Sequence, residues 1–177
     1  MCRMLGAEDE PDGVHDEGEV RKQCRRLYVL THRISKCDAM EELIELLHNQ
    51  ECSCVICHDD ETLLCHGRGV KDIHRIFKQN PEFLKDSLIA DKVVGKGAAA
   101  LMVLGGVKKV YADLISRPAL NLLETSGIPV SYMKLVEGIK NRNGDGLCPV
   151  EATCMDCLTP EECLPRIDAF IERMKAN

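Results

Sequence analysis

Charged and polar side chains cluster at two points where the sequence predicts that a helix begins. Asp91, Lys92 and Lys96 accompany the first point, and Ser116 and Arg117 the second. Free N–H groups at a helix start, together with Arg and Lys side chains, suit an anion such as phosphate or carboxylate. Lys92 and Lys96 are four residues apart, which places them on one face of the expected helix. We interpret these residues as ligand-binding, with a solvated helix face and an ordinary helix cap as the alternatives.

A polar loop rich in Asn, Gly and Asp precedes a second group of candidates. Asn141 and Arg142 lie in this loop and are further ligand-binding candidates, and Cys148 and Glu151 follow it. A thiolate near an arginine or a lysine is a nucleophile. The catalytic candidates are therefore Cys148, Glu151 and Asp91. No partner histidine is evident for Cys148, so a buried thiol next to a proline turn is the competing interpretation.

Cysteine is unusually frequent, with 11 in 177 residues. Near the end of the chain four of them follow the spacing C-x5-C-x2-C-x5-C, whose central C-x2-C suits one half of a tetrahedral metal site. If a metal is bound, we expect its ligands among Cys148, Cys154, Cys157 and Cys163. An iron–sulfur cluster on the same residues, or simple burial of small apolar thiols, are the alternatives.

Composition excludes several classes of partner and location. The formal net charge of −6 and an aromatic content of 3 % argue against nucleic acid, whose phosphates would be repelled and whose bases would find few rings to stack on. The longest apolar stretch, 97–107, is too short to span a bilayer, and residues 1–20 lack the apolar core of a leader. The number of cysteines is odd, and a chain of this length needs no disulfide bonds to fold. Both observations indicate a reducing, cytoplasmic location. A homo-oligomer is left open.

Two regions are expected. Residues 1–37 are predicted to be a flexible acidic tail followed by a basic arm, whose run Leu27–Leu30 fits a strand, a helix or an appended arm. Residues 38–177 are predicted to form one α/β domain that ends in a cysteine-containing segment and a helix. The expected elements are helices at 39–48, around 73–77, at 91–104, at 116–125 and from 160 onward with a kink at Pro165, a hairpin at 53–57 and 62–65, and parallel strands at 107–115 and 128–133.

Three stretches together resemble a known family. Residues 90–100 read ADKVVGKGAAA, residues 115–119 read ISRPA, and an Asn-Arg pair at 141–142 is followed by CPVE at 148–151. In this order and spacing they resemble the prokaryotic family called domain of unknown function 1893, over residues 40–170. The resemblance implies a cytidine-deaminase-like fold, a three-layer α/β/α sandwich with a mixed sheet. The family has no established activity, so the resemblance implies no reaction.

The sequence lacks the zinc-binding motifs of the zinc deaminases. These enzymes carry His-x-Glu at the start of one helix and Pro-Cys-x-x-Cys at the start of the next. The expected helix starts at 91–93 and 117–119 contain neither Cys nor His. We therefore expect no zinc at the deaminase position, and the identity of any cofactor is left open.

The expected topology brings the candidate residues together. Strands 107–115 and 128–133 should be parallel with a right-handed crossover, so their carboxyl ends share the sheet edge where open α/β folds bind ligands. We expect one concave site there that binds a small anionic or nucleotide-like molecule. An enzyme that acts on such a metabolite through Cys148 or Asp91, and a cysteine-based metal or redox module, are the alternatives. The expected site comprises Asp91, Lys92, Lys96, Ser116, Asn141, Arg142, Cys148 and Glu151.

Overall fold

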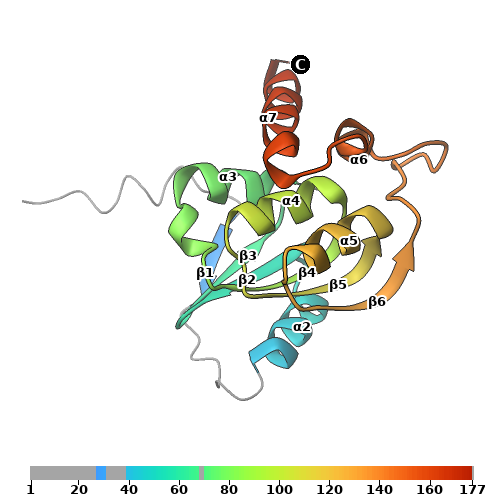
Figure 1. Cartoon of the computed structure of the whole chain (residues 1–177). Helices are drawn as coiled ribbons and strands as arrows, with labels where there is room; N and C mark the ends of the chain where they lie inside the picture. Colours follow the sequence, from blue (N-terminus) through green and yellow to red (C-terminus); the bar gives the residue numbers. More distant parts are fainter. Residues whose placement is uncertain (1–26, 31–38, 68–69, 177) are drawn as a thin grey trace, which may run out of the picture.

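A six-stranded mixed sheet forms the centre of the computed structural model, which describes residues 27–30, 39–67 and 70–176 (Figure 1). The strands are β1 (Leu27–Leu30), β2 (Cys54–His58), β3 (Glu61–Cys65), β4 (Leu88–Val94), β5 (Lys109–Ser116) and β6 (Val130–Val136). Their order in the sheet is β1-β3-β2-β4-β5-β6. The pairs β4–β5 and β5–β6 are parallel, and the other three pairs are antiparallel. The mixed α/β fold predicted from the sequence is confirmed.

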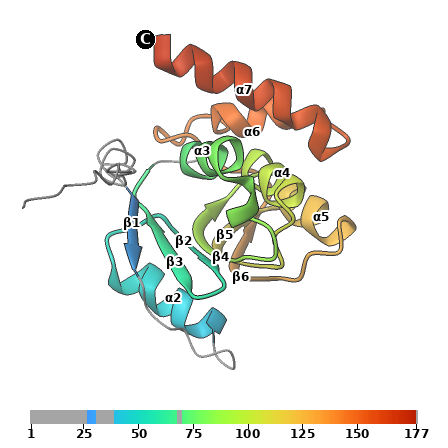
Figure 2. The same cartoon turned by 90° about the vertical axis from the view of Figure 1, so that its left-hand side faces the viewer.

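Helices cover both faces of this sheet (Figures 1 and 2). Helix α2 packs on one face and forms a small core with β2, β3 and β4. Helices α3, α4 and α5 cover the other face, and α6 and α7 pack on α4 from outside. The bounds are α2 (Ala39–Asn49), α3 (Lys71–Gln79), α4 (Lys96–Leu104), α5 (Arg117–Thr125), α6 (Pro149–Cys154), α7 (Pro160–Ala176) and a short 3-10 turn at Pro81–Phe83.

Helix α4 is the centre of the larger core. Ala99, Leu101 and Met102 are completely buried, because the helix lies between the sheet and the α6–α7 pair. Gly97 permits this packing, since a Cβ atom there would lie 2.5 Å from a methyl carbon of Val150 on α6. Burial of each large apolar side chain contributes about 1.5–3 kcal/mol to the free energy of unfolding, so this contact fixes α6 firmly on the domain.

The hairpin of β2 and β3 is confirmed, with its turn at Asp59 and Asp60. Asp59 has φ of 50°, a left-handed conformation that aspartate tolerates better than most residues. Strand alternation places Cys54 in the larger core and Cys57 in the α2 core, as expected.

The predicted helix over 91–104 is wrong in its first part. Residues 88–94 form strand β4, which pairs with β2 and β5, and the helix begins only at Lys96 after Gly95. A short apolar run does not distinguish a buried strand from a buried helix. Here the free edges of β2 and β5 supply the hydrogen-bonding partners. Asp91 is therefore no helix cap, and Lys92 and Lys96 do not share a helix face.

Several other predictions are confirmed. Ser116 caps α5, since its Oγ accepts a hydrogen bond of 3.3 Å from the amide of Ala119. Strands β5 and β6 are parallel as predicted. Helix α7 begins at Pro160 and continues through Pro165. The run Leu27–Leu30 is a strand, β1, which pairs antiparallel with β3.

The predicted acidic tail and most of the predicted basic arm lie outside the described residues. Among the helices that the structure describes, none has the length and apolarity needed to cross a lipid bilayer.

Candidate functional site

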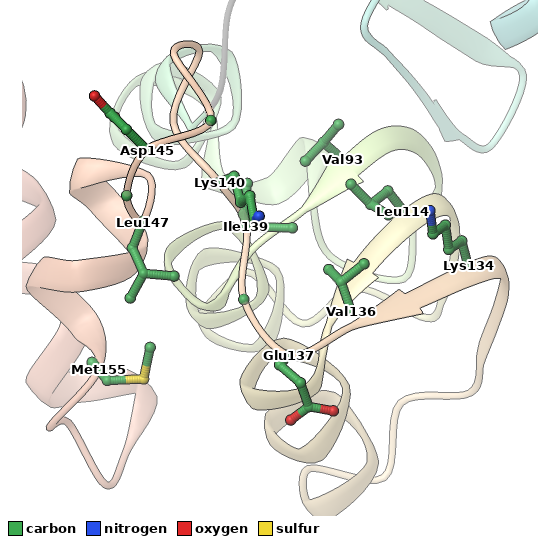
Figure 3. Close-up of a pocket in the computed structure, with 13 residues that line it drawn as sticks. Val93, Leu114, Lys134, Val136, Glu137, Ile139, Lys140, Asp145, Leu147 and Met155 are labelled. Carbon is green, nitrogen blue, oxygen red and sulfur yellow. The ribbon is translucent and has the colours of Figure 1, made fainter.

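A depression of about 830 Å³ lies at the carboxyl ends of the parallel strands (Figure 3). Its floor comes from β4, β5 and β6, and its wall from the loop that follows β6 and from the end of α6. This is the edge at which open α/β sheets place ligands, and the volume is in the range of small-molecule sites. The lining residues are Val93, Leu114, Lys134, Val136, Glu137, Gly138, Ile139, Lys140, Gly144, Asp145, Gly146, Leu147 and Met155.

The pocket opens on the face of the sheet that carries α2. Val94 and Ile115 face the larger core, so Val93 and Leu114, which precede them, face the opposite side. Helix α2 contacts β2 and β4 and leaves this part of the sheet open. The exposed fraction of Val93 is accordingly 42 %. The floor is thus an apolar surface that nothing in the described part of the chain covers.

The charged groups of the pocket are of two kinds. In the part of the chain that the structure describes, the ammonium groups of Lys134 and Lys140 have no hydrogen-bond or ion-pair partner. The carboxylates are paired: Glu137 accepts from Arg117 at 3.2 Å, and Asp145 accepts from the Asn141 side-chain amide at 2.7 Å. In Figure 3 both carboxylates point away from the apolar floor. The charge left for a ligand is therefore positive.

Behind the pocket wall, a buried clamp joins α4 to α6. Glu151 is 1 % exposed, and its Oε2 accepts a hydrogen bond of 2.6 Å from the amide of Lys96 at the start of α4. The Lys96 ammonium, also buried, donates to the carbonyl oxygens of Met155 at 2.8 Å and Cys157 at 2.6 Å. The carboxylate stabilises the positive end of the α4 dipole. Gly95 leaves room for it, since a Cβ atom there would lie 2.6 Å from Oε2.

Replacing Lys96 with methionine should lower the free energy of unfolding by about 2 kcal/mol. The aliphatic part of the side chain is kept, but the carbonyl oxygens of Met155 and Cys157 lose a charged donor. Denaturant unfolding measures the loss, with Lys109→Met as the exposed control at the other end of the sheet. Equal stabilities of the two variants would contradict the clamp.

Asp91 is paired with Cys54 on the neighbouring strand β2, on the face of the sheet that carries the larger core. Its Oδ1 accepts a hydrogen bond of 2.9 Å from the amide of Val93, and the carboxyl group is 8 % exposed. Burial raises its pKa to about 7, against the opposing effect of the hydrogen bonds from Val93 and the Cys54 thiol. This carboxyl group can therefore gain or lose a proton near neutral pH. A hydrogen bond with Cys65, together with burial and the nearby Asp91 carboxyl group, raises the pKa of Cys54.

Three of the four predicted metal ligands lie close together. Cys154, Cys157 and Cys163 are buried, and the Cys163 thiol donates toward Cys154, which lowers the pKa of Cys154 and raises that of Cys163. Cys148 begins α6 and is half-buried. The described residues contain no group of three or more His, Cys, Asp or Glu side chains arranged to hold a metal ion.

The predicted site residues do not gather in one place. Lys96 and Glu151 meet in the clamp, with Cys148 one turn before Glu151. Asp91 lies with Cys54, and Ser116 caps α5. None of the predicted residues is among those that line the pocket.

Two of the predicted residues lie behind the pocket instead: Arg117 and Asn141 hold its carboxylates. The sequence analysis missed Lys134 and Lys140. Lys134 lies in the last part of β6 and Lys140 in the loop that follows this strand, and that position was the available signal.

Comparison with known proteins identifies the family. A model of the domain of unknown function DUF1893 (TM1506) matches residues 42–171. The crystal structure of a DUF1893 family protein, TM1506 from Thermotoga maritima, is similar with a TM-score of 0.70 and 24 % sequence identity. The alignment covers 79 % of this chain and 94 % of that one. No curated protein matches. The matched segment includes every lining residue of the pocket and both ends of the clamp, and the chain belongs to the DUF1893 family.

Proposed function

We propose that this protein binds a small anionic molecule with an apolar part, of which a nucleotide-like metabolite is one example, in the pocket at the carboxyl ends of β4, β5 and β6. The observation that carries the proposal is the pair of unpartnered ammonium groups, Lys134 and Lys140, above an apolar floor whose carboxylates are already paired. An anionic group would meet the lysines, and its apolar part would cover Val93 and Leu114. Arg142, two residues beyond Lys140, and Lys92, next to Val93, are proposed to add positive charge at the rim.

The fold is proposed to be cytidine-deaminase-like, a three-layer sandwich, without zinc-dependent deamination. Supporting the first part, a helix lies on one face of a mixed sheet and further helices lie on the other. Supporting the second, residues 91–93 and 117–119, the positions expected for the deaminase motifs, offer no Cys or His to a zinc ion. The second of these segments opens helix α5, whereas the first lies on strand β4.

A cytoplasmic location is also proposed, with neither nucleic acid nor a membrane as a partner. The eight cysteines in the described part of the chain are all free thiols, which fits a reducing compartment. The net charge of −6 disfavours nucleic acid.

Loss of either pocket lysine should weaken anion binding about tenfold, which corresponds to about 1.4 kcal/mol. Lys134→Gln and Lys140→Gln each remove one unpaired charge, and the double variant should abolish measurable binding. A thermal-shift screen of nucleotides, sugar phosphates and carboxylates identifies a ligand, and calorimetry then gives the affinities. Lys109→Gln is the matched control, because it removes an exposed charge at the opposite end of β5.

The proposal would be contradicted by either of two results. One is that no anion in the screen stabilises the wild-type protein. The other is that Lys109→Gln weakens binding as much as the pocket variants do.

An enzyme that uses Asp91 is the second candidate. The observation that favours it is a buried carboxyl group whose pKa of about 7 suits proton transfer at neutral pH, next to the Cys54 thiol. Any compound that stabilises the protein should then be converted by the wild type and left unchanged by Asp91→Asn, as product analysis by mass spectrometry would show. Equal conversion by both proteins would exclude this candidate.

A further inference from the structure

An irregular step crosses the three parallel strands at one level. The pairing of β4 with β5 skips Lys92 and Asp113, and the pairing of β5 with β6 skips Asp113 and Met133. On β5, Ala112 and Ile115 both belong to the larger core, although residues three positions apart face opposite sides of a regular strand. The same break separates core residues on β4 and β6: Ile89 from Val94, and Val130 from Leu135. Each strand therefore accommodates one extra residue at this level. Extra residues of this kind re-aim side chains and are over-represented next to active sites.

The irregular step places two successive residues of β5 on the face of the sheet that carries α2. Asp113 binds His48 in the last turn of α2, and Leu114 belongs to the pocket floor. Val93 and Lys134 pair with Leu114 on either side, and Figure 3 shows these three side chains in a row. Because successive Cα atoms are about 3.8 Å apart, Asp113, with His48 bound to it, lies at the edge of the floor.

Asp113 orients the imidazole of His48. Its Oδ1 accepts from Nε2 of His48 at 2.8 Å and from the hydroxyl of Tyr111 at 2.9 Å. Burial, together with Asp113, raises the pKa of Tyr111 to about 12, so this hydroxyl remains a donor at neutral pH. Because a carboxylate only accepts, the neutral imidazole carries its proton on Nε2 and its Nδ1 is an acceptor without a partner among the described residues. The side chain of His48 is 43 % exposed. An imidazole that a carboxylate orients in this way is suited to act as a general base.

Two ammonium groups without partners lie on the same face. Asp91 faces the larger core, so Lys92, which follows it, faces the α2 side next to Val93 of the floor. Burial raises the pKa of the Cys52 thiol in the α2 core, and the charge of the nearby Lys92 opposes this shift. In the part of the chain that the structure describes, neither Lys92 nor Lys134 forms an ion pair or a hydrogen bond through its side chain. Their charges are available to a bound anion or to negative charge that develops during a reaction.

The openness of the pocket indicates which reaction such a base performs. Val93 on the floor is 42 % exposed, and α2 leaves this part of the sheet uncovered. Removal of a proton from carbon is favoured in a site that closes and expels water. An open pocket instead supplies water to the base, so water is the reactant that His48 would meet.

We propose that His48 is the general base in the hydrolysis of a carboxylic ester that the pocket holds by an anionic group. The proposal rests on the anion binding proposed above. Nδ1 of His48 takes a proton from water as the water oxygen bonds to the ester carbonyl carbon. The carbonyl electron pair moves onto its oxygen, where Lys92 stabilises the negative charge. The bond from carbon to the alcohol oxygen then breaks, and His48 returns the proton to that oxygen. The products are an alcohol and a carboxylic acid, which ionises in water.

Hydrolysis of the mono-para-nitrophenyl ester of glutaric acid tests the proposal, with release of para-nitrophenolate measured by absorbance. His48→Gln should lower kcat at least about a hundredfold. Asp113→Asn should lower kcat with little change in KM, because it disturbs the base and not the binding, whereas Lys134→Gln should raise KM about tenfold. His58→Gln is the matched control and should leave hydrolysis unchanged. His58 also faces an aspartate, Asp59 at 3.6 Å, but it lies at the opposite end of the sheet.

Calorimetry with glutarate separates binding from chemistry, because glutarate carries the anionic groups but no ester. If glutarate binds and Lys134→Gln weakens its binding, but wild type hydrolyses the ester no faster than His48→Gln does, the hydrolysis is excluded and anion binding stands. Equal hydrolysis by wild type of the uncharged para-nitrophenyl butyrate would exclude recognition of an anionic group. If glutarate does not bind and its ester is not hydrolysed, the hydrolysis is excluded, and the anion binding is excluded with it when no anion in the screen described above binds.

Discussion

Replacing Asp91 with asparagine should stabilise the protein above pH 7 by about 4 kcal/mol relative to its effect at pH 4. The folded carboxyl group has a pKa of about 7, raised from 3.8 chiefly by burial. Between these two values the unfolded chain releases the proton while the folded chain still holds it. The wild-type protein therefore loses stability as the pH rises from about 4 to about 7, and the loss is complete above pH 7. Asparagine carries no charge and avoids this loss.

The measurement is urea unfolding of both proteins at pH 4, 6 and 8. The difference in free energy of unfolding between Asp91→Asn and wild type should grow with pH and then level off. Asp60→Asn, in the exposed turn of the hairpin, is the control and should show a small difference that does not follow this course. A difference for Asp91→Asn that stays constant across the pH range would mean that folding does not raise the pKa of this carboxyl group.

Replacing Glu151 with alanine should lower the free energy of unfolding by about 3–4 kcal/mol. The change removes the acceptor of the Lys96 amide at the start of α4 and leaves that donor buried without a partner. It also opens a cavity where the Glu151 side chain was 1 % exposed. Equilibrium unfolding in urea gives the loss, and hydrogen exchange should show faster exchange in α6.

Glu151→Gln separates the parts of this effect. Its side-chain carbonyl can still accept from the Lys96 amide, so the loss should be only about 1 kcal/mol. Glu161→Ala, a change of the same size at an exposed residue of α7, is the control for a general effect of removing a carboxylate. If Glu151→Ala were no more destabilising than Glu161→Ala, the clamp between α4 and α6 would not hold.

Local signals were sufficient for much of the fold. Two short, mainly apolar runs on either side of an acidic turn predicted the hairpin of β2 and β3, and the Ser116 cap with Pro118 predicted the start of α5. The parallel pairing of β5 and β6 followed from the length of the helix between them. Each of these depends on residues close together in the chain, where sequence and geometry are directly linked.

The boundary before α4 could not be read locally. A segment of seven residues, of which five are apolar, is compatible with strand or helix, and β4 exists because β2 and β5 flank it on both sides. The misplaced helix start put Asp91, Lys92 and Lys96 on one helix, whereas the structure places Asp91 and Lys92 on β4 and Lys96 at the start of α4. The edge of the sheet predicted for the ligand is still the one where the pocket lies.

The sequence by itself determined the family, the α/β class and the polar loop that walls the pocket, because these are properties of composition, order and spacing. Only the tertiary structure decided which charges remain available. Lys96 is used by carbonyl oxygens from α6 and the segment after it, whereas Lys134 and Lys140 have no partner among the described residues. All three are lysines, so residue type alone does not distinguish them. What distinguishes them is which long-range neighbours satisfy their charge, and packing alone sets that.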